Sequence, residues 1–416
     1  MYLAVNIVGV LIFLLIGFIF SKNKKQINWR GVITMVVLNL VLAWFLTSFS
    51  VGRAIVEGAA AGFNQLMEVS YEGIKFAFPS MVEVKQMDWF FQVLMPILMI
   101  VPLFDILTYI GVLPWVVKWI GKGLSKITGQ PKFESFFAVE MMFLGNTEAL
   151  AVSSLQLKQI NAKRNLTLAM MSMSCVTASI IGSYTKMMPG QYILTAVPLN
   201  VINALIVTAM LNPVKVTPEE DTIAKMQSSQ EIAEEEVEGG KAAEEPKPGK
   251  EPFFSFLGDS ILGAGKLILI ITANVVAFVA LAALINKLLG LVNPWLSLEH
   301  LLGIVMYPFA WLMGLNPTNA FQFAQHMGTK LVTNEFVVMG QVTNHVKSYA
   351  PHYQAVLTAF LTSFANFSTL GMIIGCFKGI VNKEKNTLIS KNVAYLLLSG
   401  ILVSLLTAAM MGLFVW

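Results

Sequence analysis

The sequence predicts an all-α integral membrane protein with eight transmembrane helices, two opposed re-entrant hairpins and interfacial helices, related by an inverted repeat. Hydrophobic residues make up 56% of its 416 positions and charged residues only 12%, against about 25% charged residues in soluble domains. The apolar runs are continuous, which favours helices over the alternating pattern of barrel strands. Two similar polar turns, each between apolar segments, indicate the repeat.

Eight apolar stretches reach the length of about 20 residues that a membrane-spanning helix needs. Only one of them contains a charged residue, Asp105, for which we favour a helix-packing or snorkelling role. The first stretch follows no basic segment and is long, so we interpret it as a span and not as a cleaved signal peptide. The predicted spans are 1–21, 31–52, 89–117, 165–185, 187–214, 267–286, 353–377 and 392–416.

Lysine and arginine residues predict the orientation of these spans, because they collect in short cytoplasmic loops. One topology places four basic clusters in the cytoplasm and both termini outside, and it also places 214–252 inside. It requires 132–160 and 317–343 each to enter and leave on one side, as re-entrant hairpins. The clusters are Lys22, Lys24, Lys25 and Arg30; Lys118, Lys122, Lys126 and Lys132; Lys158, Lys163 and Arg164; and Lys378, Lys383, Lys385 and Lys391.

Three segments outside the spans have patterns of their own. Residues 53–80 place apolar side chains at helical spacing and predict an amphipathic helix in the outer interface. Trp115 and Trp119 predict a second interfacial segment at the cytoplasmic edge. The stretch from Glu219 to Glu251 has almost no large apolar residues, so we expect it to be mobile and to separate the two copies of the repeat.

Two short polar turns occupy the expected hairpin tips, Gly145-Asn146-Thr147-Glu148 and Thr333-Asn334-Glu335-Phe336. A glutamate at membrane depth costs about 2.5–3.5 kcal/mol on insertion scales, so two glutamates in matching contexts predict a polar site. A polar break in an apolar span follows each tip, at 177–182 and at 364–369. Opposed hairpins bring their tips toward the bilayer midplane, where the binding sites of many transporters lie.

The chemistry of these positions favours a neutral solute with several hydroxyl groups and a planar ring, and it would also suit a coupling cation. The tips offer carboxylates, amides and hydroxyls, and the breaks add polar side chains and one aromatic face. Neither hairpin contains arginine, which an anionic solute would be expected to recruit. Bonding to a neighbouring helix is the alternative role for each polar residue in the breaks. These residues are Ser179, Ser183, Phe364, Asn366, Ser368 and Thr369.

Several function classes find no support in the sequence. No spacing resembles a metal site, a phosphate-binding loop or a catalytic triad, so we expect neither an enzyme nor a cofactor. The basic residues lie at membrane edges, so the net charge of +4 gives no reason to expect a nucleic-acid partner. A channel-like pore remains as an alternative, although closing hairpins suit occlusion better than continuous conduction. We expect Cys175 and Cys376 to pack in apolar surroundings, and His300, His326, His345 and His352 to lie at solvated surfaces.

The two tips and the motif Phe364-Ala365-Asn366-Phe367-Ser368, in this order and spacing, resemble the concentrative nucleoside transporter family over nearly the whole chain. The resemblance implies cation-coupled nucleoside import across a plasma membrane by a protein in contact with lipid, and the short eight-span form indicates a bacterial inner membrane. It implies a homotrimer in which a transport domain moves like an elevator against a scaffold. The implied division is scaffold at 1–112 and 253–300, transport domain at 113–214 and 301–416, and mobile cytoplasmic loop at 215–252.

The resemblance also implies which residues bind the substrate. Asn146, Thr147 and Glu148, next to Gly145, match the family's residues that read the nucleobase. The family commonly has glutamine where Asn146 stands, so the contacts with the base are expected to differ.

The second tip and the second break carry the remaining matches. Glu335 and Asn366 match the residues that bind the ribose hydroxyls, and Phe364 matches the residue that packs on the base. Thr369 stands where the family often has serine. The implied substrate site therefore takes residues from both copies of the repeat.

The coupling ion is the last implication of the resemblance. Sodium-coupled members use an asparagine four residues before the tip glycine, and that position is Met141, a poor ligand for a hard cation. We therefore expect proton coupling, with sodium as the alternative. Glu148 is the expected proton carrier, because burial favours the neutral form of a carboxyl group. Ser179 and Ser183 are further candidates for the coupling-ion site.

Overall fold

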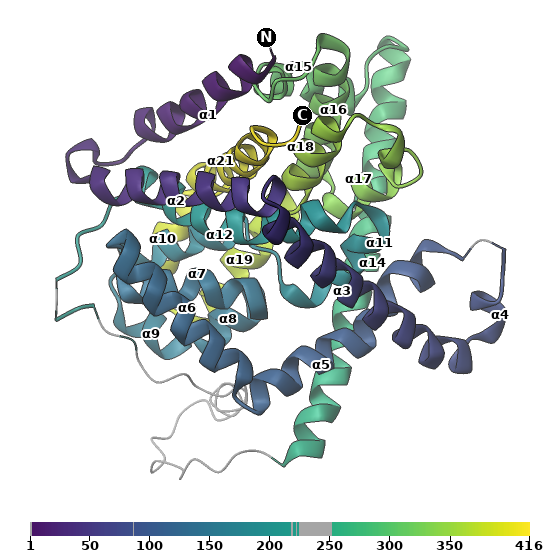
Figure 1. Cartoon of the computed structure of the whole chain (residues 1–416), viewed down its shortest axis with the longest axis horizontal. Coiled ribbons are helices and arrows are strands. Elements are labelled where there is room, and N and C mark those ends of the chain that lie inside the picture. The colour runs from purple at the N-terminus through teal and green to yellow at the C-terminus, as the bar shows by residue number, and fades with distance from the viewer. Residues whose placement is uncertain (1, 86, 218, 222, 224–251) are drawn as a thin grey trace.

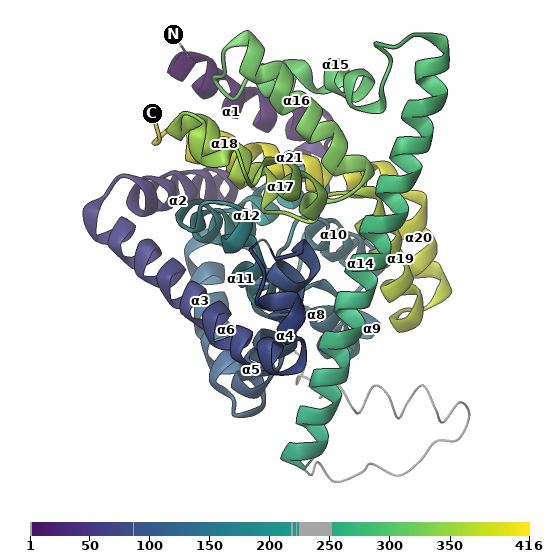
Figure 2. The same cartoon turned by 90° about the vertical axis from the view of Figure 1, so that its right-hand side faces the viewer.

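The computed structural model describes residues 2–85, 87–217, 219–221, 223 and 252–416, and within these every side chain except that of Thr147. This part of the chain is helical throughout its regular elements and contains no strand. Both termini lie at one end of the molecule, and the long helix α14 (Phe253–Val292) begins at the other end (Figure 1, Figure 2). The arrangement agrees with the predicted topology, in which both termini share one side of the membrane.

Six segments of the described chain are long and apolar enough to cross a bilayer as continuous helices. The third of them is irregular, because a π-helical turn, η2 (Phe90–Leu94), precedes a helix that contains Pro102. The six are α1 (Tyr2–Ile19), α2 (Trp29–Thr47), the Phe90–Tyr109 segment made of η2 and α5 (Ile97–Tyr109), α12 (Gly190–Leu211), α14 and α21 (Val393–Gly412).

The other two predicted spans are interrupted where the polar breaks predicted. α10 (Ala162–Ser172) and α11 (Ala178–Met187) form one, and α18 (Pro351–Leu361) and α19 (Phe367–Ile380) form the other. Irregular backbone at membrane depth is tolerated only where protein or a water-filled cavity satisfies its polar groups. The prediction of eight spans is confirmed, with six continuous and two broken.

Both predicted hairpins are present, and they approach the centre from opposite ends of the molecule. In Figure 2, α16 and α17 of the second hairpin lie above α8 and α9 of the first. Each hairpin consists of a longer limb, a non-helical tip and a short returning helix. The first contains α7 (Lys132–Leu144), α8 (Asn146–Val152) and α9 (Ser154–Gln159), and the second contains α16 (Pro317–Val332) and α17 (Glu335–Val342).

Helices outside the spans include two that the sequence patterns did not predict. The outer amphipathic helix is α3 (Ser50–Ala77), followed by α4 (Pro79–Val82), and the segment with Trp115 and Trp119 is α6 (Val112–Thr128). α15 (Leu298–Trp311) was missed because it is shorter than a span and contains Pro308. α20 (Lys383–Lys391) was missed because it is polar, although Asn382 caps its first turn. Short 3₁₀ turns lie at Lys24–Gln26 and Val346–Ser348.

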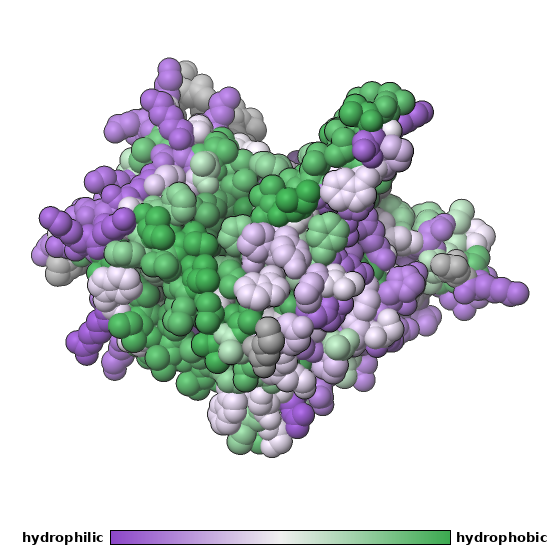
Figure 3. Space-filling view, turned by 90° about the horizontal axis from the view of Figure 1, so that it is seen from above, coloured by the Kyte–Doolittle hydropathy of each residue, from purple (hydrophilic) through white to green (hydrophobic). Residues whose placement is uncertain are grey.

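The spans differ in how much protein covers them. α12 and α21 are the most enclosed of the six continuous spans, whereas α14 is the most exposed. On α14, Leu262, Leu269 and Leu291 are 74%, 69% and 79% exposed. Ser260 of α14 donates a hydrogen bond to Asp105 of α5, which gives that half-buried acid a helix-packing role. Figure 3 shows a broad apolar area on the face seen there, as expected for a protein surrounded by lipid.

The predicted cytoplasmic end of the first hairpin is tied to its broken span by a buried ion pair. Arg164 of α10 lies 2.7 Å from both carboxylate oxygens of Glu134 on α7, and it also donates to the Glu220 carbonyl at 2.9 Å. Asp221 accepts from the Lys132 backbone N–H at 2.6 Å. The first residues of the predicted mobile loop thus lie against helices, whereas 224–251 fall outside the described residues.

α20 also contacts this end of the first hairpin. Lys385 donates to the carbonyls of Leu157 at 3.3 Å and Lys158 at 2.5 Å, where α9 ends. A cation at a helix C-terminus stabilises the unpaired carbonyls there. Burial lowers the pKa of the Lys385 ammonium.

The prediction that all four histidines lie at solvated surfaces is wrong for His352 and for His326, which is half-buried with its Nε2 enclosed. The His352 side chain is 7% exposed, and its ring nitrogens lie 2.9 Å from the carbonyl oxygens of Met313 and Val415. Its ring stacks on Trp416 with centroids 3.9 Å apart. The sequence places His352 at the start of a broken span, but the contacts that bury it come from distant segments.

Candidate functional site

The two tips and the two broken spans meet crosswise. α8 of the first hairpin contacts α19 of the second broken span, and α11 of the first broken span contacts α17 of the second hairpin. Each copy of the repeat therefore supplies groups to the other. Helices that carry predicted site residues of one copy thus pack against helices of the other copy.

Gly145 makes the first tip compact. Its φ of +92° lies in a region that favours glycine. A Cβ atom there would lie 3.1 Å from the Thr177 Cβ and 3.3 Å from Glu148 Oε2. Thr177, in the first break, donates to the Phe143 carbonyl at 3.2 Å and lies 3.0 Å from the Ser179 hydroxyl. The tip and the break are thus joined directly, and a larger residue at position 145 would separate them.

The predicted base-reading residues of the first tip have unmatched polar groups. Asn146 is 5% exposed, and neither atom of its amide has a hydrogen-bond partner among the described residues. Glu148 is exposed, so the burial expected of the proton carrier is not found at this residue. Thr147 begins α8 with them, but its side chain lies outside the described part of the structure. A buried amide without a partner is costly, so this tip is suited to bind a polar ligand.

The second tip centres on Glu335, which is 3% exposed. The Tyr184 hydroxyl donates to its Oε1 at 3.0 Å, and the Asn366 amide donates to its Oε2 at 3.3 Å. Tyr184 comes from α11 of the first copy, and Asn366 comes from the second break. The carboxylate therefore accepts bonds from both copies, and it retains lone pairs for further donors.

Asparagine side chains start both helices that leave the second tip and the second break. Asn334 accepts from the Val337 N–H at 3.0 Å, and Asn366 accepts from the Thr369 N–H at 2.8 Å. Both bonds are helix N-caps, which fix the direction of the chain. Asn366 thus uses its oxygen for the cap and its amide nitrogen for Glu335. Phe364 is half-buried beside the break, and Thr369 is 4% exposed.

The candidate coupling-ion residues divide into two groups. The Ser183 hydroxyl donates to the Val93 carbonyl at 2.7 Å and is fully buried, which is a helix-bonding contact. Ser179 bonds Thr177 next to the first tip. Met141 is fully buried, and its sulfur accepts from the Ser172 hydroxyl at 3.3 Å. A thioether therefore faces a hydroxyl where the first limb meets α10.

Three functional candidates were not identified as site residues from the sequence. Tyr184 lies on α11 and Lys330 lies on α16. Glu140 lies on α7. It is fully buried, with Oε2 accepting from Ser153 at 2.7 Å and Oε1 without a partner among the described residues. Only its position, a carboxyl group one turn before the tip, signalled a role.

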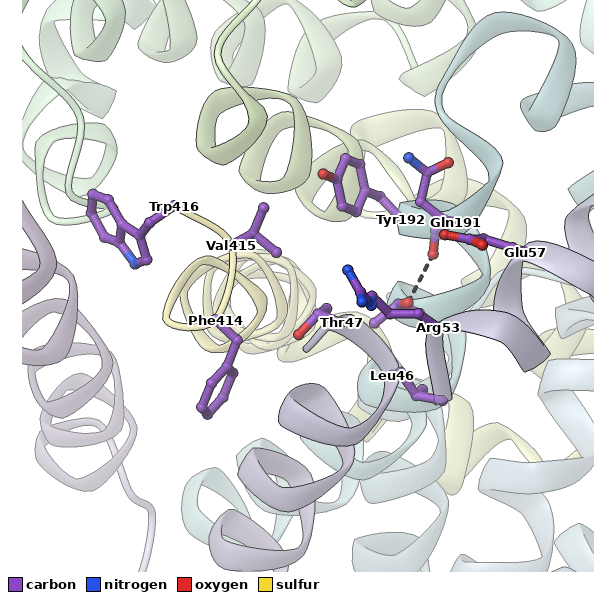
Figure 4. A pocket seen from close by; sticks show the side chains of 10 residues that line it. Leu46, Thr47, Arg53, Glu57, Gln191, Tyr192, Phe414, Val415 and Trp416 are labelled. Carbon is purple, nitrogen blue, oxygen red and sulfur yellow. Dashed lines mark hydrogen bonds between the residues drawn. The ribbon is translucent and has the colours of Figure 1, made fainter. Parts of the chain in front are cut away.

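A separate cavity of about 280 Å³ lies away from the tips, toward the end of the chain. It is formed by the end of α2, the start of α3, the start of α12 and the last residues (Figure 4). Arg53 and Glu57 reach into it from α3, and Thr195 donates to the Gln191 carbonyl on its wall at 2.8 Å. The predicted site residues do not line this cavity.

Family models match most of the chain. Residues 8–81 match the "Na+ dependent nucleoside transporter N-terminus", 90–190 match a "Nucleoside recognition" region named Gate, and 192–412 match the "Na+ dependent nucleoside transporter C-terminus". The chain belongs to the concentrative nucleoside transporter family. It is therefore a multi-pass membrane protein of a family of nucleoside transporters, which are transport proteins and not enzymes.

Relatives in this family span the same length. The Bacillus subtilis purine nucleoside transport protein NupG is 45% identical over the full length of both chains. The Helicobacter pylori nucleoside permease NupC is 26% identical over 99% of this chain and 97% of its own. CNTnw in an inward-facing substrate-bound state has the same fold, with a TM-score of 0.88 at 23% identity over 100% of this chain and 98% of its own. A CNTnw variant in an outward-facing state also gives a TM-score of 0.88.

Proposed function

We propose that this family member imports purine nucleosides with protons across a bacterial inner membrane. The observation that carries the proposal is the crossing of the tips: α8, which begins with the unpartnered Asn146 and contains Glu148, packs against α19, which Asn366 caps beside Glu335. In this assignment Glu335 and Asn366 bind the ribose hydroxyls. Asn146, Thr147 and Glu148 read the base.

The substrate preference rests on a relative and not on the site alone. NupG, which is 45% identical over its full length, is described as a purine nucleoside transport protein. The short Asn146 side chain leaves more room at the first tip than glutamine would, which is compatible with the larger purine ring. Phe364, half-buried at the second break, offers the flat surface on which a base packs.

Proton coupling is supported by the surroundings of Met141. Sodium is a hard cation that prefers oxygen ligands, and here a thioether accepts the Ser172 hydroxyl in the last turn of α7. The matching family models carry Na+ in their descriptions, so the proposal concerns this chain's departure from that pattern. A proton needs only a carboxyl group, and the first tip has Glu148 next to the substrate.

The assembly and movement are proposed on the same basis. The exposed apolar face of α14 suits packing against other copies in a homotrimer, with α1, α2, α3, α5 and α14 as a fixed scaffold. The hairpins and broken spans then move as an elevator. Lys186 of α11 lies 2.5 Å from Glu68 of α3, a contact that such movement must break. A disulfide between cysteines at these two positions should stop uptake, and a reductant should restore it. Native mass spectrometry of the detergent-solubilised protein tests the trimer.

The coupling experiment measures labelled adenosine uptake into proteoliposomes. We expect uptake to rise as external pH falls from about 8 to 6, because protonation and nucleoside binding favour each other. Uptake should collapse with a protonophore and continue when choline replaces sodium. Met141→Asn is the matched variant, because it restores an oxygen ligand and should make uptake respond to sodium. Uptake by the parent that requires sodium and ignores pH would overturn proton coupling.

Competition by unlabelled nucleosides tests the substrate. Adenosine and guanosine should inhibit labelled adenosine uptake at lower concentration than uridine or cytidine. Deoxyadenosine, which lacks a ribose hydroxyl, should inhibit less well than adenosine if Glu335 and Asn366 bind the sugar. Equal inhibition by all four ribonucleosides would remove the purine preference while leaving the site assignment intact.

A further inference from the structure

Lys330 is a fully buried cation in the last turn of α16, beside the second tip. Its Nζ donates to the Phe360 carbonyl at 2.6 Å and to the Ser363 hydroxyl at 2.7 Å. The ammonium also lies 4.4 Å from the centroid of the Phe360 ring. Ser363 is itself 2.6 Å from the Ser404 hydroxyl of α21. These contacts form a coordination shell of the kind that proteins build around cations.

The position of this shell gives it a structural effect. α18 ends at Leu361, so its last carbonyl groups lack helical partners and carry a partial negative charge. The Lys330 ammonium satisfies one of them and binds the hydroxyl that follows. The hairpin limb and the broken span are therefore joined by a cation directly below the tip.

A buried cation also requires a counter-charge. Between residues 301 and 380, the sequence contains only one carboxylate, Glu335. No ion pair within 4 Å joins it to Lys330, but the two residues lie five positions apart, on the two sides of the tip. Glu335 accepts hydrogen bonds from Tyr184 and Asn366, as an ionised carboxylate does.

The first copy of the repeat lacks this cation. In the last turn of α7 the neutral sulfur of Met141 accepts from Ser172 at the end of α10, and no residue of that turn is charged. The first tip has carboxyl groups at positions 140 and 148, and neither forms an ion pair with any described residue. The charge at the second tip is therefore a feature of that copy and not of the hairpin fold.

We propose that Lys330 is a positioning residue for the sugar. Its ammonium is a tethered cation that joins the end of α18 to the second tip and keeps Glu335 ionised, so that the carboxylate accepts hydrogen bonds from sugar hydroxyls. The inference rests on the proposed sugar contact of Glu335. It adds a charged residue that touches no substrate to the residues that determine affinity.

Few other titratable groups face this cluster. His326 lies one turn before Lys330 on α16 and is half-buried, and Tyr184 reaches Glu335 from α11. α18 contributes His352 and Tyr353 at its far end, α19 contributes Cys376 and Lys378, and α21 contributes Tyr395 near its start. Two further acids lie on helices packed against this region: Glu299 on α15, which accepts from the Asn286 amide at 2.9 and 3.1 Å, and Glu148 on α8, which packs against α19. Glu335 is the acid nearest to Lys330 along the chain, so loss of the Lys330 charge acts first on Glu335.

The test measures adenosine binding to the purified full-length protein by calorimetry between about pH 6 and pH 9. Lys330→Gln keeps an N–H donor for Phe360 and Ser363 but removes the charge. We expect its affinity at pH 7 to fall at least about tenfold, because a carboxyl without its cation is protonated more readily. Raising the pH ionises Glu335 again, so the ratio of variant to parent affinity should recover about tenfold by pH 9.

Matched variants separate the charge from the packing. Lys330→Arg keeps the charge and should bind within about threefold of the parent across the same range. Lys378→Gln makes the same charge change on an exposed site and should bind as the parent does. In a Glu335→Gln background, adding Lys330→Gln should lower adenosine affinity little further, because residue 335 is then already neutral. Lys330→Met provides the same comparison if Lys330→Gln does not fold.

Two results would overturn the inference. One is binding by Lys330→Gln within about twofold of the parent at pH 7, and the other is a loss of affinity that is equal at every pH. A wrong assignment of Glu335 to the sugar would give a different result, because Glu335→Gln would then bind adenosine as well as the parent does.

Discussion

The two hairpin tips have similar turns, but their carboxyl groups have different surroundings. At the second tip, Glu335 accepts from Tyr184 and Asn366 and has a cation nearby in Lys330. At the first tip, Glu148 is exposed and Glu140 is buried with one oxygen unpartnered. A carboxyl group with donors and a cation is stable as an anion, whereas one without them is readily neutralised. Under the proposed proton coupling, we therefore expect the proton to be gained and lost in the first copy and the charge to stay fixed in the second.

The hairpins also differ in where a cation ties them to their broken spans. The first is joined at its base, through Arg164 of α10 and Glu134 of α7. The second is joined beside its tip, through Lys330 of α16 and the end of α18. An ion pair at the base of the first hairpin leaves its tip free to respond to a ligand or a proton. The contact of Lys330 beside the second tip fixes the conformation of that tip.

Breaking the ion pair between Arg164 and Glu134 should have the largest effect on stability. Arg164→Met leaves the carboxylate of Glu134 buried without its two hydrogen bonds, at a cost of about 3–5 kcal/mol. The measurement is thermal unfolding of the purified protein. The double variant Arg164→Met, Glu134→Met should recover much of the loss, because no unpaired charge remains. If the single and double variants unfold at the same temperature, the ion pair is not what fixes this hairpin.

The second comparison concerns adenosine affinity and sets residues at the second tip and break against a control residue in the first copy. Glu335→Ala or Asn366→Ala leaves buried partners unmatched, and each should weaken adenosine binding by about 1–3 kcal/mol. Ser183→Ala is the control, because its hydroxyl bonds the Val93 carbonyl and not the tips. Unchanged affinity in both site variants would show that the sugar is bound elsewhere.

Much of this architecture could be predicted from the sequence, because it depends on local patterns. Apolar run length predicted the spans, and the polar breaks in two of them predicted the interruptions. The tips were predicted because glutamate in an apolar setting is expensive. Glu335 and Asn366 are brought within hydrogen-bonding distance, and Asn146 is left without a partner, as a ligand site requires.

The remaining features depend on contacts between distant segments. Tyr184 reaches Glu335 across 151 positions, and Lys330 finds its partners at the end of another helix. His352 is buried by carbonyls from two other segments. No local pattern records such pairings. α15 and α20 were missed for a different reason, since one is too short for a span and the other too polar to be recognised by hydrophobic periodicity.

The third comparison separates the two acids of the first tip. Glu148→Gln should flatten the pH response of uptake by about tenfold between pH 8 and pH 6, because the neutral amide cannot exchange a proton. Some binding should survive, since the amide still offers an acceptor. Glu140→Gln is the matched variant, and it should leave the response in place if Glu148 is the carrier. A flat response in Glu140→Gln with a normal one in Glu148→Gln would move the proton to the buried acid.

The smallest effect is expected from the segment that joins the two copies. Residues Gln227 to Lys247 lie outside the described residues, and their composition predicts no docking, because charged residues without apolar anchors bury little surface. Deleting them should leave uptake within about twofold of the parent, measured in cells that express equal amounts of protein. The deletion spares Glu220 and Asp221, which contact Arg164 and Lys132.

Asp221→Ala provides the matched control at the edge of that deletion. Its loss removes an exposed contact and should cost at most about 1 kcal/mol of stability. If the deletion abolished uptake while membrane insertion stayed normal and Asp221→Ala had no effect, the connecting segment itself would take part in transport. The two copies would then be coupled through the loop as well as through the crossing of their tips. If uptake persists, the crossing of the tips is sufficient to couple them.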